Sequence, residues 1–86
     1  MTFEDLEFKQ VPDGRGIQAE AEFDNGYGAS VVQSEFTYGG KSGFYELAVT
    51  KGGRLCYDTP ITDNVCGFLT EAEVTGLLVR IEGLKG

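Results

Sequence analysis

The sequence contains no histidine, and this absence excludes several kinds of chemistry. A chain without imidazole cannot build a Ser-His-Asp or Cys-His nucleophile pair, a zinc site with histidine ligands, or an imidazole acid-base relay near neutral pH. We therefore expect a protein that is not an enzyme, holds no metal ion and uses no cofactor. A small hydrolase or nuclease built on carboxylates alone remains an alternative, since every acidic chain offers such pairs.

Long apolar runs are also missing. No stretch approaches the ~18 apolar residues of a membrane-spanning helix, and the N-terminus has no basic segment followed by an apolar one. We therefore expect neither a membrane anchor nor a signal peptide, and we expect a cytoplasmic location.

Basic residues are scarce, with 7 Lys and Arg against 14 Asp and Glu, a net charge of −7 over 86 residues. The seven are scattered along the chain, whereas phosphate binding needs clustered Lys and Arg. This balance argues against direct contact with nucleic acid or anionic lipid. It would attract a partner protein with a basic surface, although the same charge also serves solubility alone.

The only two cysteines, Cys56 and Cys66, lie ten positions apart and form no Cys-x-x-Cys motif. A disulfide framework in so short a chain usually needs four or more cysteines. We expect both to be reduced thiols that pack as small apolar side chains. Whether either has a function stays open.

Glycine, at 13 of 86 residues, separates short runs that have the character of strands. The clearest run is 17–23, where apolar and polar residues alternate with the period of two of a half-buried strand. The Asn25-Gly26 pair that follows is a strong hairpin signal, because both central residues of the favoured two-residue turn need positive φ. We predict five strands in one domain of residues 1–86, in the runs 3–11, 17–23, 29–36, 44–50 and 54–57.

A C-terminal helix is predicted from several independent signals. The sequence Thr70-Glu71-Ala72-Glu73 fits a capping box, in which Thr70 and Glu73 each bond the other's backbone N–H. An apolar stripe follows at helical spacing, and Gly83 is a natural end. The stripe consists of Val74, Leu77, Leu78 and Ile81.

Three further expectations concern residues within and before this helix. Gly76 weakens a helix, so we expect another group to approach it closely. Residues 63–69 are expected to form a short helical turn capped by Thr62 or Asp63. Pro60 should prevent an interior strand in the preceding residues.

These elements predict an α+β fold, an antiparallel β-meander of about five strands with the C-terminal amphipathic helix packed on one face. A five-stranded barrel closed on itself is the alternative, because an open sheet leaves its second face in water.

Two stretches of the sequence contain motifs that together resemble one group of proteins. One is Asn-Gly-Tyr-Gly-Ala-Ser-Val-Val at 25–32, and the other is Tyr-Glu-Leu-Ala-Val at 45–49 followed by Tyr-Asp-Thr-Pro-Ile-Thr-Asp at 57–63. Over about residues 24–73 the chain resembles small proteins encoded in phage and prophage genomes. The resemblance implies a virus-encoded protein expressed in a bacterial cytoplasm. It does not imply any particular activity. Cys66 departs from the aliphatic residues of those proteins.

The first candidate binding site combines a hairpin tip with a glycine-rich loop. Asp24, Asn25 and Tyr27 surround the first turn, and Tyr38 begins the loop at 38–43. Tyrosines flanked by glycine present a large, rigid, amphipathic surface at small entropic cost. The alternative is that the glycines serve turn geometry and the tyrosines cover the ends of the sheet.

The second candidate is an acidic strand face. Glu20 and Glu22 alternate with the apolar residues of run 17–23, and Glu35 and Glu46 are expected to join them from neighbouring strands. Carboxylates in rows could mimic nucleic-acid phosphates, or they form an ordinary solvated face.

Together these features favour a non-enzymatic phage or prophage accessory protein that binds a bacterial host or defence protein, with inhibition as one result. A structural or morphogenetic virion protein that acts by self-association is one alternative. An acidic mimic of nucleic acid is another. The sequence indicates neither the partner nor the oligomeric state.

Overall fold

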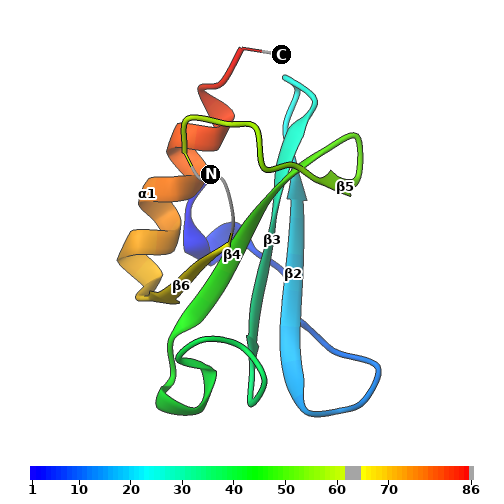
Figure 1. Cartoon of the computed structure of the whole chain (residues 1–86), viewed down its shortest axis with the longest axis vertical. Coiled ribbons are helices and arrows are strands. Elements are labelled where there is room, and N and C mark those ends of the chain that lie inside the picture. Colours follow the sequence, from blue (N-terminus) through cyan, green and yellow to red (C-terminus); the bar gives the residue numbers. More distant parts are fainter. Residues whose placement is uncertain (62–64, 86) are drawn as a thin grey trace.

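The computed structural model describes residues 1–61 and 65–85. It contains a twisted sheet with one long helix along one side (Figure 1). In chain order the elements are the 3-10 helix η1 (Phe3–Asp5), β1 (Lys9–Gln10), β2 (Gly16–Glu22), β3 (Tyr27–Ser34), the 3-10 helix η2 (Gly40–Ser42), β4 (Tyr45–Lys51), β5 (Arg54–Leu55), β6 (Cys66–Leu69) and α1 (Glu71–Glu82).

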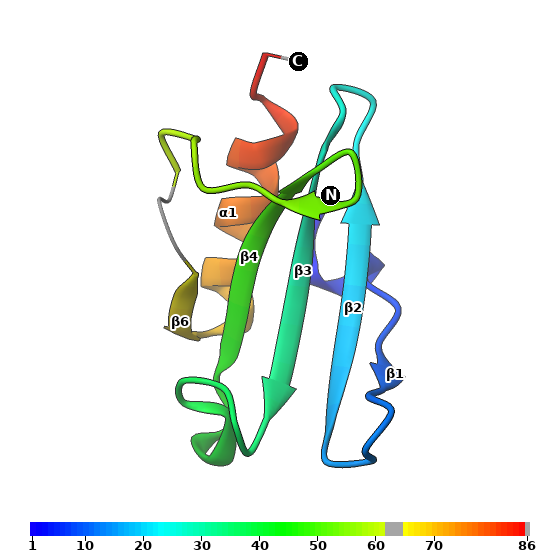
Figure 2. The same cartoon turned by 45° about the vertical axis from the view of Figure 1, so that its right-hand side comes forward.

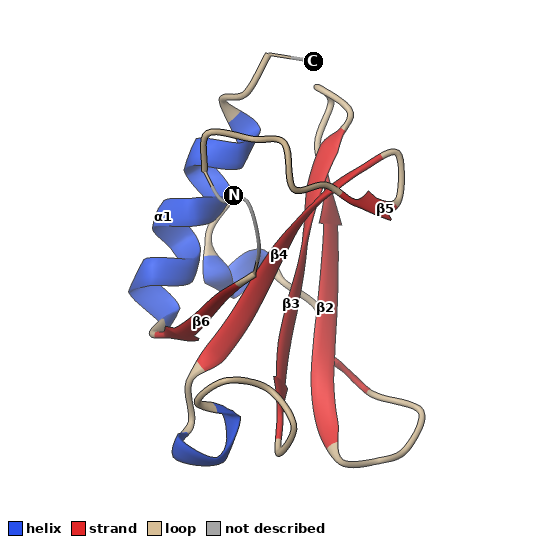
Figure 3. Cartoon of the chain, in the orientation of Figure 1, coloured by secondary structure: helices blue, strands red, loops and turns tan. Residues whose placement is uncertain are grey.

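The strands pair in the order β1-β2-β3-β4-β5, and every pairing is antiparallel. The sixth strand, β6, also pairs antiparallel with β4. The predicted meander with a C-terminal helix is confirmed, and Figure 3 shows the α+β composition. Among the described strands the sheet stays open, since no pairing joins β1 to β5 or β6, so the barrel alternative is not adopted.

The core lies between α1 and one face of the sheet (Figure 2). On the helix, Val74, Leu78 and Ile81 have no exposed surface. They pack against alternate residues of the strands, as the period of two requires. The sheet contributes Ala29, Val31, Leu47, Val49 and Leu69 to this cluster.

The helix begins with the predicted capping box. Thr70 Oγ1 accepts from the Glu73 N–H at 3.2 Å, and Glu73 Oε1 accepts from the Thr70 N–H at 3.0 Å. The helix ends at Glu82, directly before Gly83, as expected. This part of the fold is local in origin, because each signal lies within one turn of the residue that it affects.

The turn between β2 and β3 forms where predicted but has a different geometry. Asn25 does not have positive φ, whereas Gly26 does (φ 87°). The hydrogen bonds from Gly26 N to Phe23 O and from Phe23 N to Tyr27 O enclose a three-residue loop instead of a two-residue one. In this loop the Asn25 side chain is directed toward the helix.

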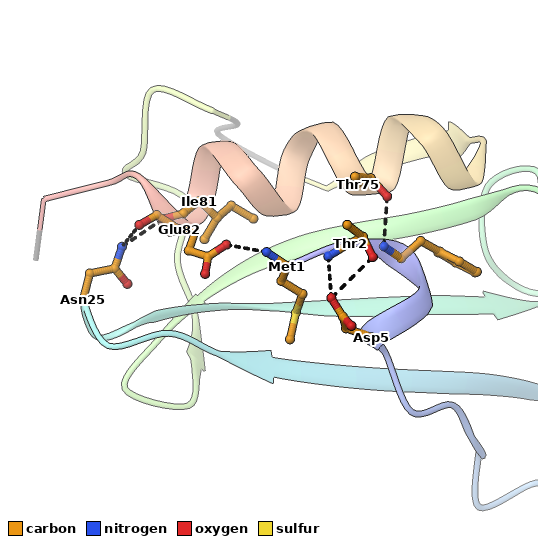
Figure 4. Close-up of polar contacts among 8 residues, drawn as sticks. Met1, Thr2, Asp5, Asn25, Thr75, Ile81 and Glu82 are labelled. Atoms are coloured by element: carbon orange, nitrogen blue, oxygen red, sulfur yellow. Dashed lines mark hydrogen bonds and ion pairs between the residues drawn. The ribbon is translucent and has the colours of Figure 1, made fainter.

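The Asn25 amide caps the C-terminal end of α1 (Figure 4). Its Nδ2 donates to the carbonyl oxygens of Ile81 at 2.9 Å, Glu82 at 3.2 Å and Leu84 at 2.8 Å. Its Oδ1 accepts from Tyr27 N at 3.0 Å. The last carbonyls of a helix have no partner within the helix, so this one side chain both closes the hairpin and satisfies the helix end.

The N-terminal residues are also tied to α1. The Met1 ammonium group pairs with Glu82 Oε1 at 2.7 Å, and Phe3 N donates to Thr75 Oγ1 at 2.9 Å (Figure 4). The strand predicted over 3–11 is therefore wrong except at Lys9–Gln10. Residues 3–5 form a 3-10 helix that packs on α1, and only Lys9–Gln10 pairs with β2.

The helical turn expected over 63–69 is also wrong for its described part. Cys66–Leu69 is a strand that pairs with β4, with an irregular register between Tyr45 and Leu47. The expected caps Thr62 and Asp63 lie outside the described residues. Cys56 and Cys66 are free thiols at the margin of the core, as expected.

Gly76 contradicts the expectation of a close approach. Among residues 1–61 and 65–85, no atom of another segment lies within 4 Å of a Cβ built at Gly76. The residue borders an open hollow of about 410 Å³, which is lined by Ile61, Cys66, Leu69, Glu73, Gly76, Leu77 and Arg80.

We expect Gly76→Ala to stabilise the protein by about 0.5–1 kcal/mol, because alanine restricts the unfolded chain and meets no obstacle in the helix. Urea unfolding monitored by circular dichroism measures this change. An unchanged or lower free energy of unfolding would show that the hollow is filled in solution.

We expect Asn25→Ala to destabilise the protein by about 1–3 kcal/mol, because it removes the side-chain donor to the Glu82 and Leu84 carbonyls and the acceptor for the Tyr27 N–H. Asn25→Asp keeps the acceptor for Tyr27 but places negative charge beside the negative helix end, so it should be no more stable than the alanine variant. Urea unfolding of both variants checks the cap. A loss below 0.5 kcal/mol for both, well under the ~1 kcal/mol of one ordinary hydrogen bond, contradicts it.

Candidate functional site

The residues of the first predicted site lie at opposite ends of the sheet. Asp24, Asn25 and Tyr27 are at the hairpin between β2 and β3, whereas Tyr38 lies in the loop between β3 and β4. Figure 1 shows the hairpin at the top and the loop at the bottom. The fold therefore divides this predicted site into two separate surfaces.

At the hairpin end, most polar groups are used within the chain. The Asn25 amide is bound to the helix end, as described above. The Tyr27 ring packs at the margin of the core and lies 4.8 Å from Lys51 Nζ. Asp24 is exposed. Asn25 and Tyr27 are half-buried here, and the binding of a partner at this end stays a prediction.

Glu20 and Glu22 lie on the sheet face opposite α1, where both are exposed, and they alternate along β2 with the buried Ala19 and Ala21 of the core face. The register through Val32 places Glu46 on the same face, two strands away. Glu46 Oε2 accepts from Tyr38 N at 3.0 Å. Glu35 pairs with Arg15 at 3.1 Å. The four predicted carboxylates therefore do not form a continuous row.

The loop end presents a group of aromatic side chains that we call the aromatic cluster, defined as Tyr38, Phe44 and Phe68. Tyr38 and Phe68 are stacked at 6.5 Å between ring centroids, and Phe44 lies 6.2 Å from Phe68. Tyr38 is 63% exposed and Phe68 is 61% exposed. Phe36, in the same loop, is 69% exposed, and the Arg15 guanidinium lies over its ring at 5.7 Å from the ring centroid.

Two glycines make the aromatic cluster possible. A Cβ at Gly67 would lie 2.6 Å from Tyr38 Cβ, and a Cβ at Gly39 would lie 2.7 Å from Phe68 Cδ1. Real Cβ atoms do not approach so closely, so a side chain at either position would force the rings apart. The loop and β6 are also joined by the Phe68 N–H, which donates to Tyr38 O at 3.3 Å.

Phe68 has a strained backbone. Its φ is 54°, and it is the one residue other than glycine with positive φ among those that the structure describes. An aromatic residue in this region is an outlier that costs about 1–3 kcal/mol, and such residues concentrate at functional sites. The strain orients an exposed ring beside Tyr38 instead of burying it.

Phe68 was missed by the sequence reasoning, which assigned it to a helical turn. Tyr38 was predicted, but its partner lies thirty positions away in the chain. One feature of the sequence indicates the pair, because Tyr38-Gly39 and Gly67-Phe68 each place an aromatic residue next to a glycine.

The phenol of Tyr45, on the core face of the sheet, has a raised pKa. Burial raises the pKa of the Tyr45 phenol, and the nearby Glu71 carboxylate raises it further. Tyr45 packs against the rings of Phe3 and Phe8. This phenol therefore stays neutral and belongs to the margin of the core.

A scan against protein-family models and searches of curated proteins and of solved structures each returned no match. Within residues 1–61 and 65–85, no three or more Cys, Asp or Glu side chains are grouped so that they could hold a metal ion. No helix in the same part of the chain is long and apolar enough to cross a membrane.

We expect Phe68→Gly to be more stable than Phe68→Ala by about 1 kcal/mol, the reverse of the usual order in a strand, because only glycine adopts positive φ without strain. Both variants lose the same ring, so their difference isolates the backbone. Urea unfolding of the pair measures it, and an alanine variant equal to or more stable than glycine would contradict the strained geometry.

Proposed function

We propose that this chain is a phage- or prophage-encoded accessory protein that acts without catalysis in the bacterial cytoplasm. In this proposal it binds a host or defence protein through the aromatic cluster and Phe36, and inhibition of that protein is the result. The setting rests on the resemblance of the motifs at 25–32 and 45–63, and the lack of histidine supports a role without catalysis.

The observation that carries the proposal is the exposure of Phe36, Tyr38 and Phe68 at one end of the sheet. Burying large aromatic side chains is the main source of binding energy at protein interfaces, where Tyr, Trp and Arg form most hot spots. Tyr38 and Phe68 are held by backbone and glycine contacts, so they lose little conformational freedom on binding.

Arg15 adds a polar margin to this surface. Its guanidinium lies over the Phe36 ring and also pairs with Glu35. An apolar centre with a charged margin is the usual anatomy of a protein interface. The partner that fits is therefore a protein with an apolar pocket or groove.

A virion protein that assembles with copies of itself is the second candidate, because the same exposed aromatic residues could pair between two copies of the chain. A nucleic-acid mimic receives less support. Ser30 and Val32 separate Glu20 and Glu22 from Glu46 on the open face, so phosphate-like spacing is interrupted.

The test is affinity capture from a bacterial host lysate with immobilised wild-type protein and with a Phe36→Ser/Tyr38→Ser double variant. Val79→Ser is the matched control, since Val79 is 55% exposed on α1, away from the cluster. A captured protein is then purified, and its affinity is measured by calorimetry. We expect the double variant to lose at least tenfold in affinity, about 1.4 kcal/mol, and the control to lose little.

Equal affinity of the double variant and the control would contradict binding through this surface. Light scattering after size exclusion measures the oligomeric state and so distinguishes self-association from binding of a host protein. A defined oligomer that the double variant dissociates favours self-association over a host partner.

A further inference from the structure

The outer edge of β2 is paired over only part of its length. β1 covers the beginning of β2, where Lys9 pairs with Gln18 and Gln10 with Ile17. In Figure 2, β1 lies beside the lower part of β2. The arrowhead end of β2 has no neighbouring strand on the side where β1 lies. The chain leaves the sheet before Lys9 because residues 3–5 turn onto the helix.

The register shows which backbone groups this leaves unpaired. Phe23 N donates to Tyr27 O on the β3 side. Backbone N–H and C=O groups alternate in direction along a strand, so those of Ala21 and Ala19 are also directed toward β3. The residues between them, Glu20 and Glu22, direct their N–H and C=O groups to the outer edge. Among the described residues, the N-terminal segment makes no backbone hydrogen bond to either.

The surroundings of this edge are acidic. The exposed side chains of Glu20 and Glu22 stand along it, the exposed Asp24 follows, and Glu7 precedes Lys9. Glu7 and Glu20 also line a hollow of about 340 Å³ beside β1, together with Lys9, Gln10, Val11, Pro12 and Gln18. Lys9 is the single basic residue among the residues named here.

We propose that this edge, which we call the β2 edge, binds an extended segment of a partner protein that carries Lys or Arg at alternate positions. The segment adds as a strand beside Glu20 and Glu22 and exchanges hydrogen bonds with their free N–H and C=O groups. Its alternate basic side chains lie over the two glutamates, and one of them fits the hollow between Glu7 and Glu20. Charge complementarity thus selects the occupant.

The same charges exclude a second copy of this chain as the occupant. Two β2 edges joined antiparallel would set Glu20 and Glu22 against the same residues of the other copy, and like charges directly opposite each other destabilise a strand pair. The acidic edge therefore opposes self-pairing and favours a basic strand.

The test uses the full-length protein labelled with ¹⁵N and an acetylated, amidated peptide, Thr-Lys-Val-Lys-Val-Lys-Thr. In the free protein, the amides of Glu20 and Glu22 should exchange with solvent much faster than those of Ala19 and Ala21, which face β3. With excess peptide we expect exchange at Glu20 and Glu22 to slow at least about tenfold, and exchange at the two alanines to stay unchanged.

Two control peptides separate strand addition from simple charge attraction. A peptide with glutamate in place of lysine should not bind. A peptide with N-methyl groups on the backbone nitrogens of its three lysines, which stand opposite Glu20 and Glu22 in the proposed pairing, keeps its charge but cannot donate hydrogen bonds to the edge, so it should bind at least tenfold more weakly. Equal binding of the N-methyl peptide would overturn strand addition.

The matched variants test the charge contribution. Glu20→Gln/Glu22→Gln should weaken the binding of the lysine peptide at least tenfold. Glu4→Gln/Asp58→Asn removes the same number of negative charges at exposed residues outside the edge and should have little effect on binding of the lysine peptide. Equal loss in both variants would overturn the site, as would amides at Glu20 and Glu22 that are protected in the free protein.

This inference does not depend on the proposed function, because the β2 edge and the aromatic cluster are separate surfaces. The Phe36→Ser/Tyr38→Ser variant should bind the lysine peptide like the wild type. Loss of binding there would contradict an edge site, whereas failure of the lysate capture leaves the peptide result unaffected.

Discussion

The packing of one helical stripe on one sheet face is the contact on which the rest of the structure depends. Val74, Leu78 and Ile81 are fully buried, and each such side chain contributes about 1.5–3 kcal/mol. A chain of 86 residues has room for one small core, so this face cannot serve a partner. The N-terminus and the β2-β3 hairpin are then fastened to the same helix through Glu82 and Asn25. The opposite sheet face, its edge, its loop end and the outer side of α1 remain exposed.

Much of this arrangement could be predicted because its signals are local. Alternation over 17–23 and the capping box at Thr70 involve neighbours within a few residues, and both are confirmed. The strand at Cys66–Leu69 could not be predicted in this way. It contains Gly67 and has no clear alternation, and it is a strand because β4 provides hydrogen-bonding partners along its edge. Residues 3–5 are helical for a similar reason, since α1 binds the Phe3 N–H.

The candidate site was predictable only in pieces for the same physical reason. Tyr38 could be singled out from its glycine neighbours, but its stacking on Phe68 depends on a contact between segments thirty residues apart. Asn25 was recognised as a turn residue, whereas its bonds to Ile81 and Leu84 depend on where the helix ends in space. Sequence patterns report periodicity and turn chemistry, and they do not report which distant carbonyl a side chain will meet.

Phe68 shows why the loop end is more than a margin of the sheet. Glycine would take its positive φ without strain, and the neighbouring Gly67 shows that glycine is compatible with this segment. The Phe68 ring remains 61% exposed, so little burial offsets the backbone cost. What the chain gains is a ring fixed beside Tyr38 and Phe44 at the surface. The strained and exposed Phe68 ring therefore supports the proposal that a partner protein contacts the aromatic cluster.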